Sequence, residues 1–152
     1  MIVRPAILSD APGVSEMLYA LKAAGKRTRP CDQAFVETSY IANPRNILCA
    51  LAVDDGHVMG LQSLTHAYEG NPYGAALGMG IIGTHVSPQA ARRGVGRALF
   101  EATKLAAVEA GLTAVEAFIQ TANAEGHAYY GAMGFLPVRE DGSALIRRWD
   151  LP

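Results

Sequence analysis

Hydrophobic residues recur at helical spacing in four stretches of the chain. In the first, an apolar face from Val14 to Leu21 follows the capping oxygens of Ser9 and Asp10, and Gly25 ends the helix. The remaining stretches predict helices over residues 32–41, 94–110 and 123–133. Each is followed by a polar or glycine-containing segment, so the four helices are separate elements.

Short apolar runs between these helices predict seven strands. They cover residues 2–7, 47–53, 58–65, 79–86, 114–120, 135–139 and 144–149. Asp54-Asp55-Gly56-His57 and Asp141-Gly142 are turn sequences that favour antiparallel hairpins. A single crossover of the strand, helix, strand type joins residues 79–86 to residues 114–120, so these two strands are expected to be parallel neighbours near the centre of a mixed α/β sheet.

Composition narrows the class of protein. The 152 residues suit one domain over residues 1–152, since half are hydrophobic and 18% are charged. A net charge of −1 gives no field that would attract nucleic acid or an acidic membrane. Cys31 and Cys49 have no metal-ligand or disulfide-framework spacing, and no signal peptide or membrane span is visible. We expect a cytoplasmic protein without a metal, a membrane or a nucleic-acid partner.

The segment from Val86 to Leu99 has the pattern of an anion site. Gly94 and Gly96 let the main chain approach a ligand, and the first turn of the following helix offers free amide groups. Arginines at 92, 93 and 97 add positive charge. The segment lacks the Gly-Lys-Ser/Thr of a phosphate-binding loop and the third glycine of a dinucleotide site. Taken alone, it also fits a tight turn with solvated arginines.

Two motifs together resemble the GNAT superfamily of acetyltransferases. Val86-Ser-Pro88 followed by Ala91-Arg-Arg-Gly94-Val-Gly96 is similar to the coenzyme A motif of that superfamily, although Ala91 replaces the usual Gln or Arg. Downstream, Asn123, Tyr130 and Gly134-Phe135 match a second signature. The resemblance implies a mostly antiparallel α/β (α+β) sheet of about seven strands with about four helices and one parallel pair that splays apart.

The resemblance also implies a cosubstrate and its binding residues. Acetyl-CoA would donate the acetyl group, with its pantetheine arm between the splayed strands and paired to backbone near Val86. Asn123 and Tyr130 would contact the arm from the other side. The residues implied for the pyrophosphate are Arg92, Arg93, Gly94, Val95, Gly96, Arg97 and Ala98. A dimer through the C-terminal hairpin or strand edges is common among similar proteins.

Acetyl transfer to an amine needs an oxyanion site, an acid and a deprotonated nucleophile. Main-chain amides of the strand ending at Val86 would meet the tetrahedral oxyanion, if a distortion of that strand leaves them unpaired. Tyr130 matches the tyrosine that lies near the sulfur in the superfamily, so we expect it to be the general acid. Tyr129 is then the structural tyrosine.

The general base is open. Several superfamily members carry it six positions before the residue matching Val86, and Gly80 stands there. His85 has a side chain of suitable ordinary pKa, and Glu69 lies in the loop before the strand. Glu116, on a central strand, needs either a function or a partner such as an arginine. A water relay to a backbone carbonyl, with no dedicated base, is an equal alternative.

The acceptor site is expected between the first two helices and the loop over residues 66–78, with Tyr68 and Tyr73 in its lining. A small-molecule primary amine is the leading acceptor, while a protein N-terminus or a lysine side chain remains an alternative. Lys26-Arg27 and Arg147-Arg148 are interpreted as solvated faces. A coenzyme A sensor with little catalysis, or a purely structural domain, are the competing functions.

Overall fold

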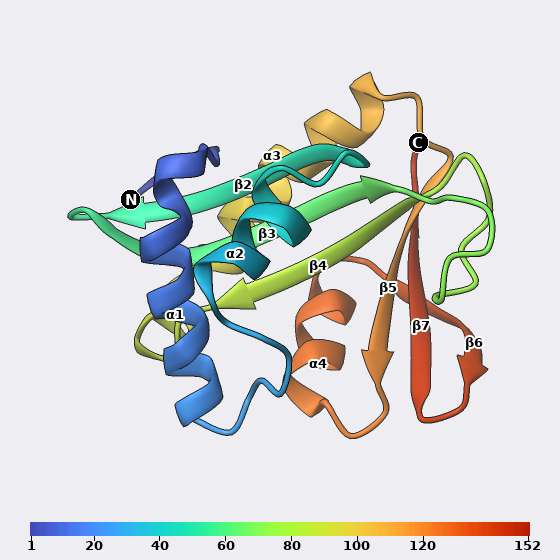
Figure 1. Ribbon diagram of the computed structural model, residues 1–152. Coiled ribbons are helices and arrows are strands. Elements are labelled where there is room, and N and C mark those ends of the chain that lie inside the picture. The colour runs from blue at the N-terminus through green and yellow to red at the C-terminus, as the bar shows by residue number, and fades with distance from the viewer.

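The computed structural model describes residues 1–152, and its centre is one seven-stranded sheet (Figure 1). The strand order is β1-β2-β3-β4-β5-β7-β6, and every neighbouring pair is antiparallel except β4 and β5. The strands are β1 (Ile2–Pro5), β2 (Asn46–Asp54), β3 (His57–His66), β4 (Gly80–Val86), β5 (Ala114–Gln120), β6 (Leu136–Asp141) and β7 (Ala144–Asp150). All seven expected strands are present, and the expected parallel pair is confirmed.

Four α-helices accompany the sheet, as the hydrophobic pattern predicts. They are α1 (Ala11–Ala23), α2 (Gln33–Val36), α3 (Val95–Glu109) and α4 (Ala124–Ala132), with short 3-10 turns at Leu8–Asp10 and Pro88–Ala90. The expected helix over residues 32–41 is one α-helical turn followed by a π-helix, Glu37–Ile41. No helix has the length and apolar character needed to cross a bilayer.

The two faces of the sheet are covered by different helices. In Figure 1, α1 and α2 lie in front of β2 and β3, while α3 lies behind them. Leu51 and Leu61 pack with α1 and α2, whereas Ala50 and Ala52 pack against α3. A side-chain carbon at Gly60 would lie 2.8 Å from Val95, so this glycine lets α3 approach β3 closely.

The N-terminal strand is joined to the start of α1 by an ion pair. Asp10 does not cap α1 with its side chain, as the sequence suggested, but accepts two hydrogen bonds of 2.8 Å from the Arg4 guanidinium. The Arg4 hydrogen bond outweighs burial and lowers the pKa of Asp10. The carboxylate therefore ties β1 to the 3-10 turn from which α1 starts, while β1 is held on the sheet by its pairing with β2.

The parallel pair opens into the feature that positions the site. β4 and β5 are paired only at Gly80 with Val115 and Ile81 with Glu116, after which the strands separate (Figure 1). β4 stays paired with β3 along its whole length, and β5 stays paired with β7. The splay is thus confined to one junction, and it leaves a gap in the middle of the sheet.

Candidate functional site

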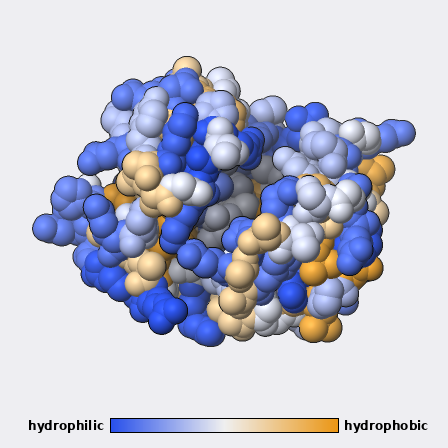
Figure 2. All heavy atoms as spheres, turned by 90° about the horizontal axis from the view of Figure 1, so that it is seen from below, coloured by the Kyte–Doolittle hydropathy of each residue, from blue (hydrophilic) through white to orange (hydrophobic).

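A cavity of about 600 Å³ occupies the gap between β4 and β5. Figure 2 shows a recess in the middle of the face seen from below, with hydrophilic residues on its rim. Its walls come from the segment between α1 and α2, the π-helix, β3, β4, the loop over residues 67–79, β5 and α4. Of the expected site residues, His85, Asn123 and Tyr130 line this cavity, together with Tyr68 and Tyr73.

The edge of β4 offers backbone groups to the gap. The carbonyl of Met79 accepts from Ala67 on the β3 side (2.9 Å), and the amide of Ser87 donates to Met59 of β3 (2.8 Å). Because backbone groups alternate sides along a strand, Thr84 and Val86 direct theirs away from β3 and into the gap beyond the last paired residue. The expected distortion of β4 is wrong, since its register with β3 is continuous. The splay itself frees these groups.

The turn from β4 into α3 forms a concave set of amides. Arg92 and Gly94 have positive φ values of 63° and 76°, a conformation that curls successive N–H groups toward one point. Val95, Gly96 and Arg97 follow in the first turn of α3, where amides lack helical partners. Ala98 differs from the expectation because its amide already donates to the Gly94 carbonyl (3.0 Å). The amides before Ala98 therefore form the cradle, which fits a pyrophosphate.

The three arginines of this turn are not equivalent. Arg93 lies 3.4 Å from the Asp54 carboxylate in the hairpin between β2 and β3, and both side chains are exposed. Arg92 and Arg97 are exposed as well, and no carboxylate lies within 4.0 Å of either. Arg92 and Arg97 are therefore the free cations beside the cradle.

Gly96 is required by a side chain of the protein itself. A side-chain carbon at this position would lie 2.5 Å from the Tyr129 ring, and the Tyr129 hydroxyl donates to the Gly96 carbonyl (2.7 Å). Tyr129 accepts in turn from the buried amide of Gln62 (3.0 Å). These contacts support a structural role for Tyr129. They also show that Gly96 is needed to make room for the Tyr129 ring, in addition to any close approach of a ligand.

Tyr130 faces the cavity from α4. Its hydroxyl lies 2.8 Å from the hydroxyl of Thr84, which accepts from the amide of Gln62 (2.9 Å). Since Gln62 supplies a donor to Thr84, the Thr84 hydrogen can point at the Tyr130 oxygen and leave the Tyr130 hydrogen for another acceptor. Burial raises the pKa of Tyr130 well above its ordinary value, so the phenol keeps its proton at neutral pH.

Asn123 serves as a cap and still offers a donor. Its side-chain oxygen accepts from the amide of Gly126 (3.0 Å) and so begins α4. The side-chain NH2 has no hydrogen-bond partner within the protein, and the residue lies in the cavity wall. Asn123 can therefore donate to a ligand from the side opposite β4.

His85 is in the wall but is a poor base. Its Nε2 lies 3.4 Å from the Tyr40 hydroxyl, which accepts from the guanidinium of Arg27 (3.1 Å). Burial, with the charges of Arg27 and Arg29, lowers the pKa of His85 to about 3. The ordinary pKa that made this histidine attractive in the sequence is therefore not its pKa here.

Glu116 is paired with arginines, which is one of the two possibilities, a function or an arginine partner, that its central position in the sheet suggested. Arg139 donates to both carboxylate oxygens (2.9 and 2.8 Å) and Arg148 to one of them (2.9 Å). Burial opposes ionisation, but these hydrogen bonds outweigh it and lower the pKa of Glu116. Because Glu116 does not line the cavity, its carboxylate is not placed to accept a proton from a ligand there.

The remaining base positions are also accounted for. A side-chain carbon at Gly80 would lie 2.7 Å from Leu112 and 2.9 Å from Leu64, so this position faces packed leucines. Glu69 is exposed and does not line the cavity. Neither Gly80 nor Glu69 therefore places a base in the cavity.

Several residues of the site were missed by sequence reasoning. Arg27, interpreted as solvated, is 8% exposed and donates to the Pro30 carbonyl and Tyr40. Arg148 is likewise engaged with Glu116. Gln62 and Thr84 connect the two tyrosines of α4 to the sheet. Gln62, between two leucine-containing stretches of a largely apolar strand, was the one visible signal, because a buried amide requires partners.

Comparison with known proteins identifies the family. A family model described as the acetyltransferase (GNAT) family matches residues 16–135. A search of curated proteins by sequence gives no match. The matched range runs from α1 to the residue before β6 and so includes the cradle, the splayed strands and α4.

Solved structures share the fold over nearly the whole chain. Ribosomal-protein-alanine N-acetyltransferase from Brucella melitensis has a TM-score of 0.78 and 19% identity, covering 99% of this chain and 100% of its own. PaiA N-acetyltransferase from Thermoplasma acidophilum, in complex with coenzyme A, has a TM-score of 0.76 and 15% identity, with 98% coverage of both chains. YncA from Salmonella typhimurium, with its cofactor acetyl-CoA, has a TM-score of 0.70 and 19% identity, covering 99% of this chain and 94% of its own.

Proposed function

The chain belongs to the GNAT acetyltransferase family, and we propose that it transfers an acetyl group from acetyl-CoA directly to the primary amine of a small molecule. The observation that carries this proposal is the pair Thr84 and Tyr130, whose hydroxyls lie 2.8 Å apart in the wall of the gap between β4 and β5. The amide cradle lies between the end of β4 and α3, outside the residues that line the cavity. A cosubstrate bound at the cradle would follow β4 to reach Tyr130.

The residues present fit acetyl-CoA, which supplies an acetyl group activated as a thioester. Amides of residues 94–97 would bind the pyrophosphate, with Arg92 and Arg97 beside them. The free backbone groups of Thr84 and Val86 would pair with the amide groups of the pantetheine arm. Asn123 would donate from the other side.

The chemistry assigned to this chain is modest. The acceptor nitrogen would add to the acetyl carbon to give a tetrahedral intermediate, and the carbon–sulfur bond would break as this intermediate collapses. Tyr130 gives its phenolic proton to the departing thiolate, and Thr84 donates to the phenolate oxygen as it forms. The nitrogen loses its proton through water, because no ionised carboxylate and no histidine of ordinary pKa lines the cavity. No cysteine lines it either, which favours direct transfer.

A coenzyme A release assay over a panel of primary amines, with peptides included, tests the proposal. We expect turnover with small amines and a loss of about 10²-fold in kcat for Tyr130→Phe, the usual worth of a general acid. Tyr19→Phe, an exposed tyrosine on α1, is the matched control and should retain full activity. Equal kcat for Tyr130→Phe and the unmodified protein would remove Tyr130 from this role.

A coenzyme A sensor is the second candidate, and the lack of a side-chain base favours it. Calorimetry with acetyl-CoA separates the alternatives. Binding without turnover for any amine supports a sensor, whereas no binding supports a purely structural domain. A cytoplasmic location and the association of two copies stay predictions, and light scattering would measure the second.

A further inference from the structure

The cavity between β4 and β5 carries positive charge and no negative charge. Its 22 lining residues include Lys26, Arg29 and Arg45 but no aspartate or glutamate. Lys26 is paired across the cleft with Glu125, at 3.1 Å between exposed groups. Arg29 and Arg45 have no carboxylate within 4.0 Å. Arg29 and Arg45 therefore line the cavity without a counter-charge, and the exposed Arg29 also has its guanidinium 5.3 Å from the centre of the Phe35 ring.

A third guanidinium stands behind the same wall. Arg27 is buried, and its hydrogen bonds go to the uncharged Pro30 carbonyl (3.2 and 2.7 Å) and Tyr40 hydroxyl (3.1 Å). No carboxylate lies within 4.0 Å of it. A buried charge is normally paired with an opposite one. The buried carboxylate of Glu116 is paired with two arginines in this way, whereas the buried guanidinium of Arg27 has no carboxylate partner.

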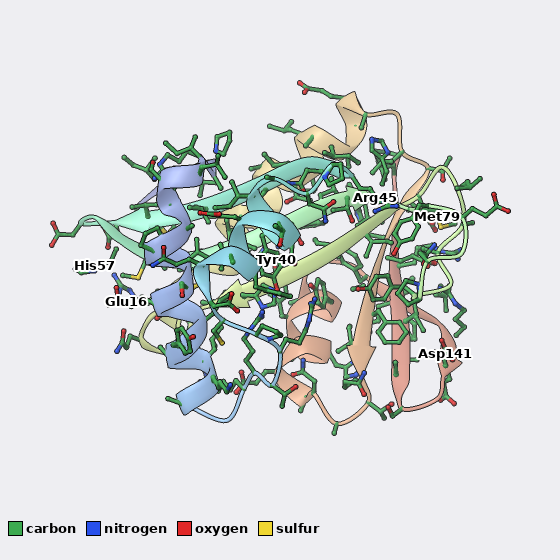
Figure 3. All side chains as sticks on the ribbon, in the orientation of Figure 1. Glu16, Tyr40, Arg45, His57, Met79 and Asp141 are labelled. Atoms are coloured by element: carbon green, nitrogen blue, oxygen red, sulfur yellow. The ribbon has the colours of Figure 1, made fainter.

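The unpaired charges lie near the reacting end of the cavity. Tyr40 connects Arg27 to His85 of β4, and Figure 3 shows Tyr40 on the helical layer in front of that strand. Thr84, the partner of Tyr130, is the residue before His85. The charges of Arg27 and Arg29 reach far enough to disfavour the protonated form of His85. Neighbouring side chains of a strand point to opposite faces, so His85 and Thr84 flank the gap from different sides, and an anion at this wall would share the cavity with Tyr130.

From this charge distribution we propose that the acceptor is a primary amine that also carries a carboxylate, and that Arg29 binds this carboxylate with Arg27 behind it. The inference rests on the proposed acetyltransferase function and names its substrate class. An amino acid carries an amine and a carboxylate, and the cavity has Arg29 for the carboxylate and Tyr130 at the reacting amine in one lining. Amines with further positive charges, such as polyamines, would meet repulsion and no carboxylate.

Aromatic residues at the other end of the cavity suit an apolar side chain. The Arg45 guanidinium lies 3.8 Å from the centre of the Tyr68 ring, and Tyr73 packs edge-on against Phe118 (5.4 Å). In Figure 3, Arg45 is placed toward the loop that ends at Met79, away from Tyr40. Arg45 is therefore assigned to this aromatic end. Arg29 is assigned to the carboxylate, because its charge acts on His85 and its own aromatic neighbour, Phe35, lies outside the cavity lining.

The test compares acceptors that share an amine and differ in charge. Phenylalanine, phenylalaninamide and phenethylamine form one series, and methionine with methioninamide forms another. We expect kcat/KM to be roughly 10- to 100-fold higher for the carboxylate than for the amide, the worth of one charge-assisted hydrogen bond. The comparison is stringent, because the amide has the less basic amine and so more of it is unprotonated at neutral pH.

Variants locate the effect. Arg29→Gln should raise the KM for phenylalanine and erase its advantage over the amide, with kcat and acetyl-CoA affinity little changed. Lys22→Gln removes the same charge from an exposed residue outside the cavity lining and should keep the preference. Arg45→Gln should also keep it. If Arg45→Gln and not Arg29→Gln abolishes the preference, the assignment to Arg29 is overturned.

The outcomes separate this inference from the proposed function. Turnover that is equal for carboxylate and amide, or highest for phenethylamine, overturns the inference and leaves the acetyltransferase function standing. If no amine turns over while acetyl-CoA binds, the transferase proposal fails. In that case, calorimetry with phenylalanine and phenylalaninamide on the acetyl-CoA complex still decides whether the wall prefers a carboxylate.

Discussion

The two walls of the cleft are built on different principles. The cofactor wall, formed by the turn before α3, the edge of β4 and α4, has a hydrogen-bonded frame of Gln62, Tyr129 and Gly96. On this frame it presents the unpaired amides of the cradle and the Asn123 NH2 group. The acceptor wall, formed by the segment between α1 and α2, the π-helix and the loop over residues 67–79, carries the unpaired Arg27 and Arg29. The first wall therefore offers mainly backbone donors held on a rigid frame, whereas the second offers side-chain cations without a counter-charge.

This difference separates binding from specificity. A wall of backbone amides and satisfied polar groups costs little to keep rigid, so it suits a cosubstrate that is bound in every cycle. A wall with uncompensated cations selects the ligand that supplies the missing charge and disfavours others. The π-helix at Glu37–Ile41, a form often found at functional sites, places Tyr40 on the second wall.

The largest loss of stability is expected from a substitution at Glu116, which holds part of the acceptor wall in place. Arg139 joins this carboxylate to the Tyr73 carbonyl (3.0 Å) and so holds the loop over residues 67–79. Glu116→Gln leaves two arginines without their charge partner, and we expect a loss of about 3–5 kcal/mol in the free energy of unfolding. Urea denaturation measures it. Acetyl-CoA affinity of the folded variant should stay within a few-fold, because the cofactor wall is untouched.

The control for this variant is a surface ion pair. Glu101→Gln breaks an exposed contact with Lys104 (2.8 Å) and should cost less than about 1 kcal/mol. Because the folded pKa of Glu116 is lowered, its contribution is present above its ordinary pKa and is lost as pH falls through the folded pKa. A Glu116→Gln protein as stable as Glu101→Gln would show that the buried network does not anchor this wall.

Most of the cofactor wall could be predicted from the sequence, because its determinants are local. Gly94 before an apolar helix specifies a left-handed turn, and Asn123 three residues before Gly126 specifies a cap. The splay of β4 and β5 was implied by resemblance. What escaped prediction was the reason for Gly96, since contact with Tyr129 joins residues 33 positions apart.

The acceptor wall could not be predicted, because its chemistry depends on which distant residues meet. The sequence predicted that Arg27 and Arg148 are solvated surface residues. In the structure Arg27 is buried beside Tyr40, and Arg148 binds Glu116. The pKa of His85 depends on burial and on charges about 55 positions earlier in the chain. The sequence therefore identifies candidate residues. Tertiary packing decides which of them are ionised, which are neutral and which lack a charge partner.

Within the cofactor wall, we expect the substitution Gly96→Ala to lower both the stability of the protein and its affinity for acetyl-CoA. Gly96→Ala places a carbon 2.5 Å from the Tyr129 ring, so either the ring or α3 must move. Overpacking of this kind costs about 1–3 kcal/mol of stability. Displacement of the turn should weaken acetyl-CoA binding about tenfold or more, and calorimetry of the folded variant measures it.

A glycine in the same region with free space around it is the matched control. A side-chain carbon at Gly131 in α4 would have its nearest neighbour, a nitrogen of Arg147, at an ordinary 3.8 Å. Gly131→Ala should therefore be neutral or stabilise the helix by up to about 1 kcal/mol. If Gly96→Ala behaves like Gly131→Ala, the close contact with Tyr129 is not what requires the glycine.

The smallest effect is expected at His85, where the two walls meet. Its pKa is about 3 in the folded protein, through burial and the charges of Arg27 and Arg29, against an ordinary value of about 6.5 in the unfolded chain. Between these values the unfolded chain binds the extra proton, so stability falls as pH drops below about 6.5. His85→Gln, which keeps an acceptor for Tyr40, should therefore lose less Tm between pH 7 and 5 than the unmodified protein. His57→Gln, at the exposed start of β3, should follow the unmodified protein. Equal slopes for all three would mean that neither burial nor the cations of the acceptor wall lower the pKa of His85.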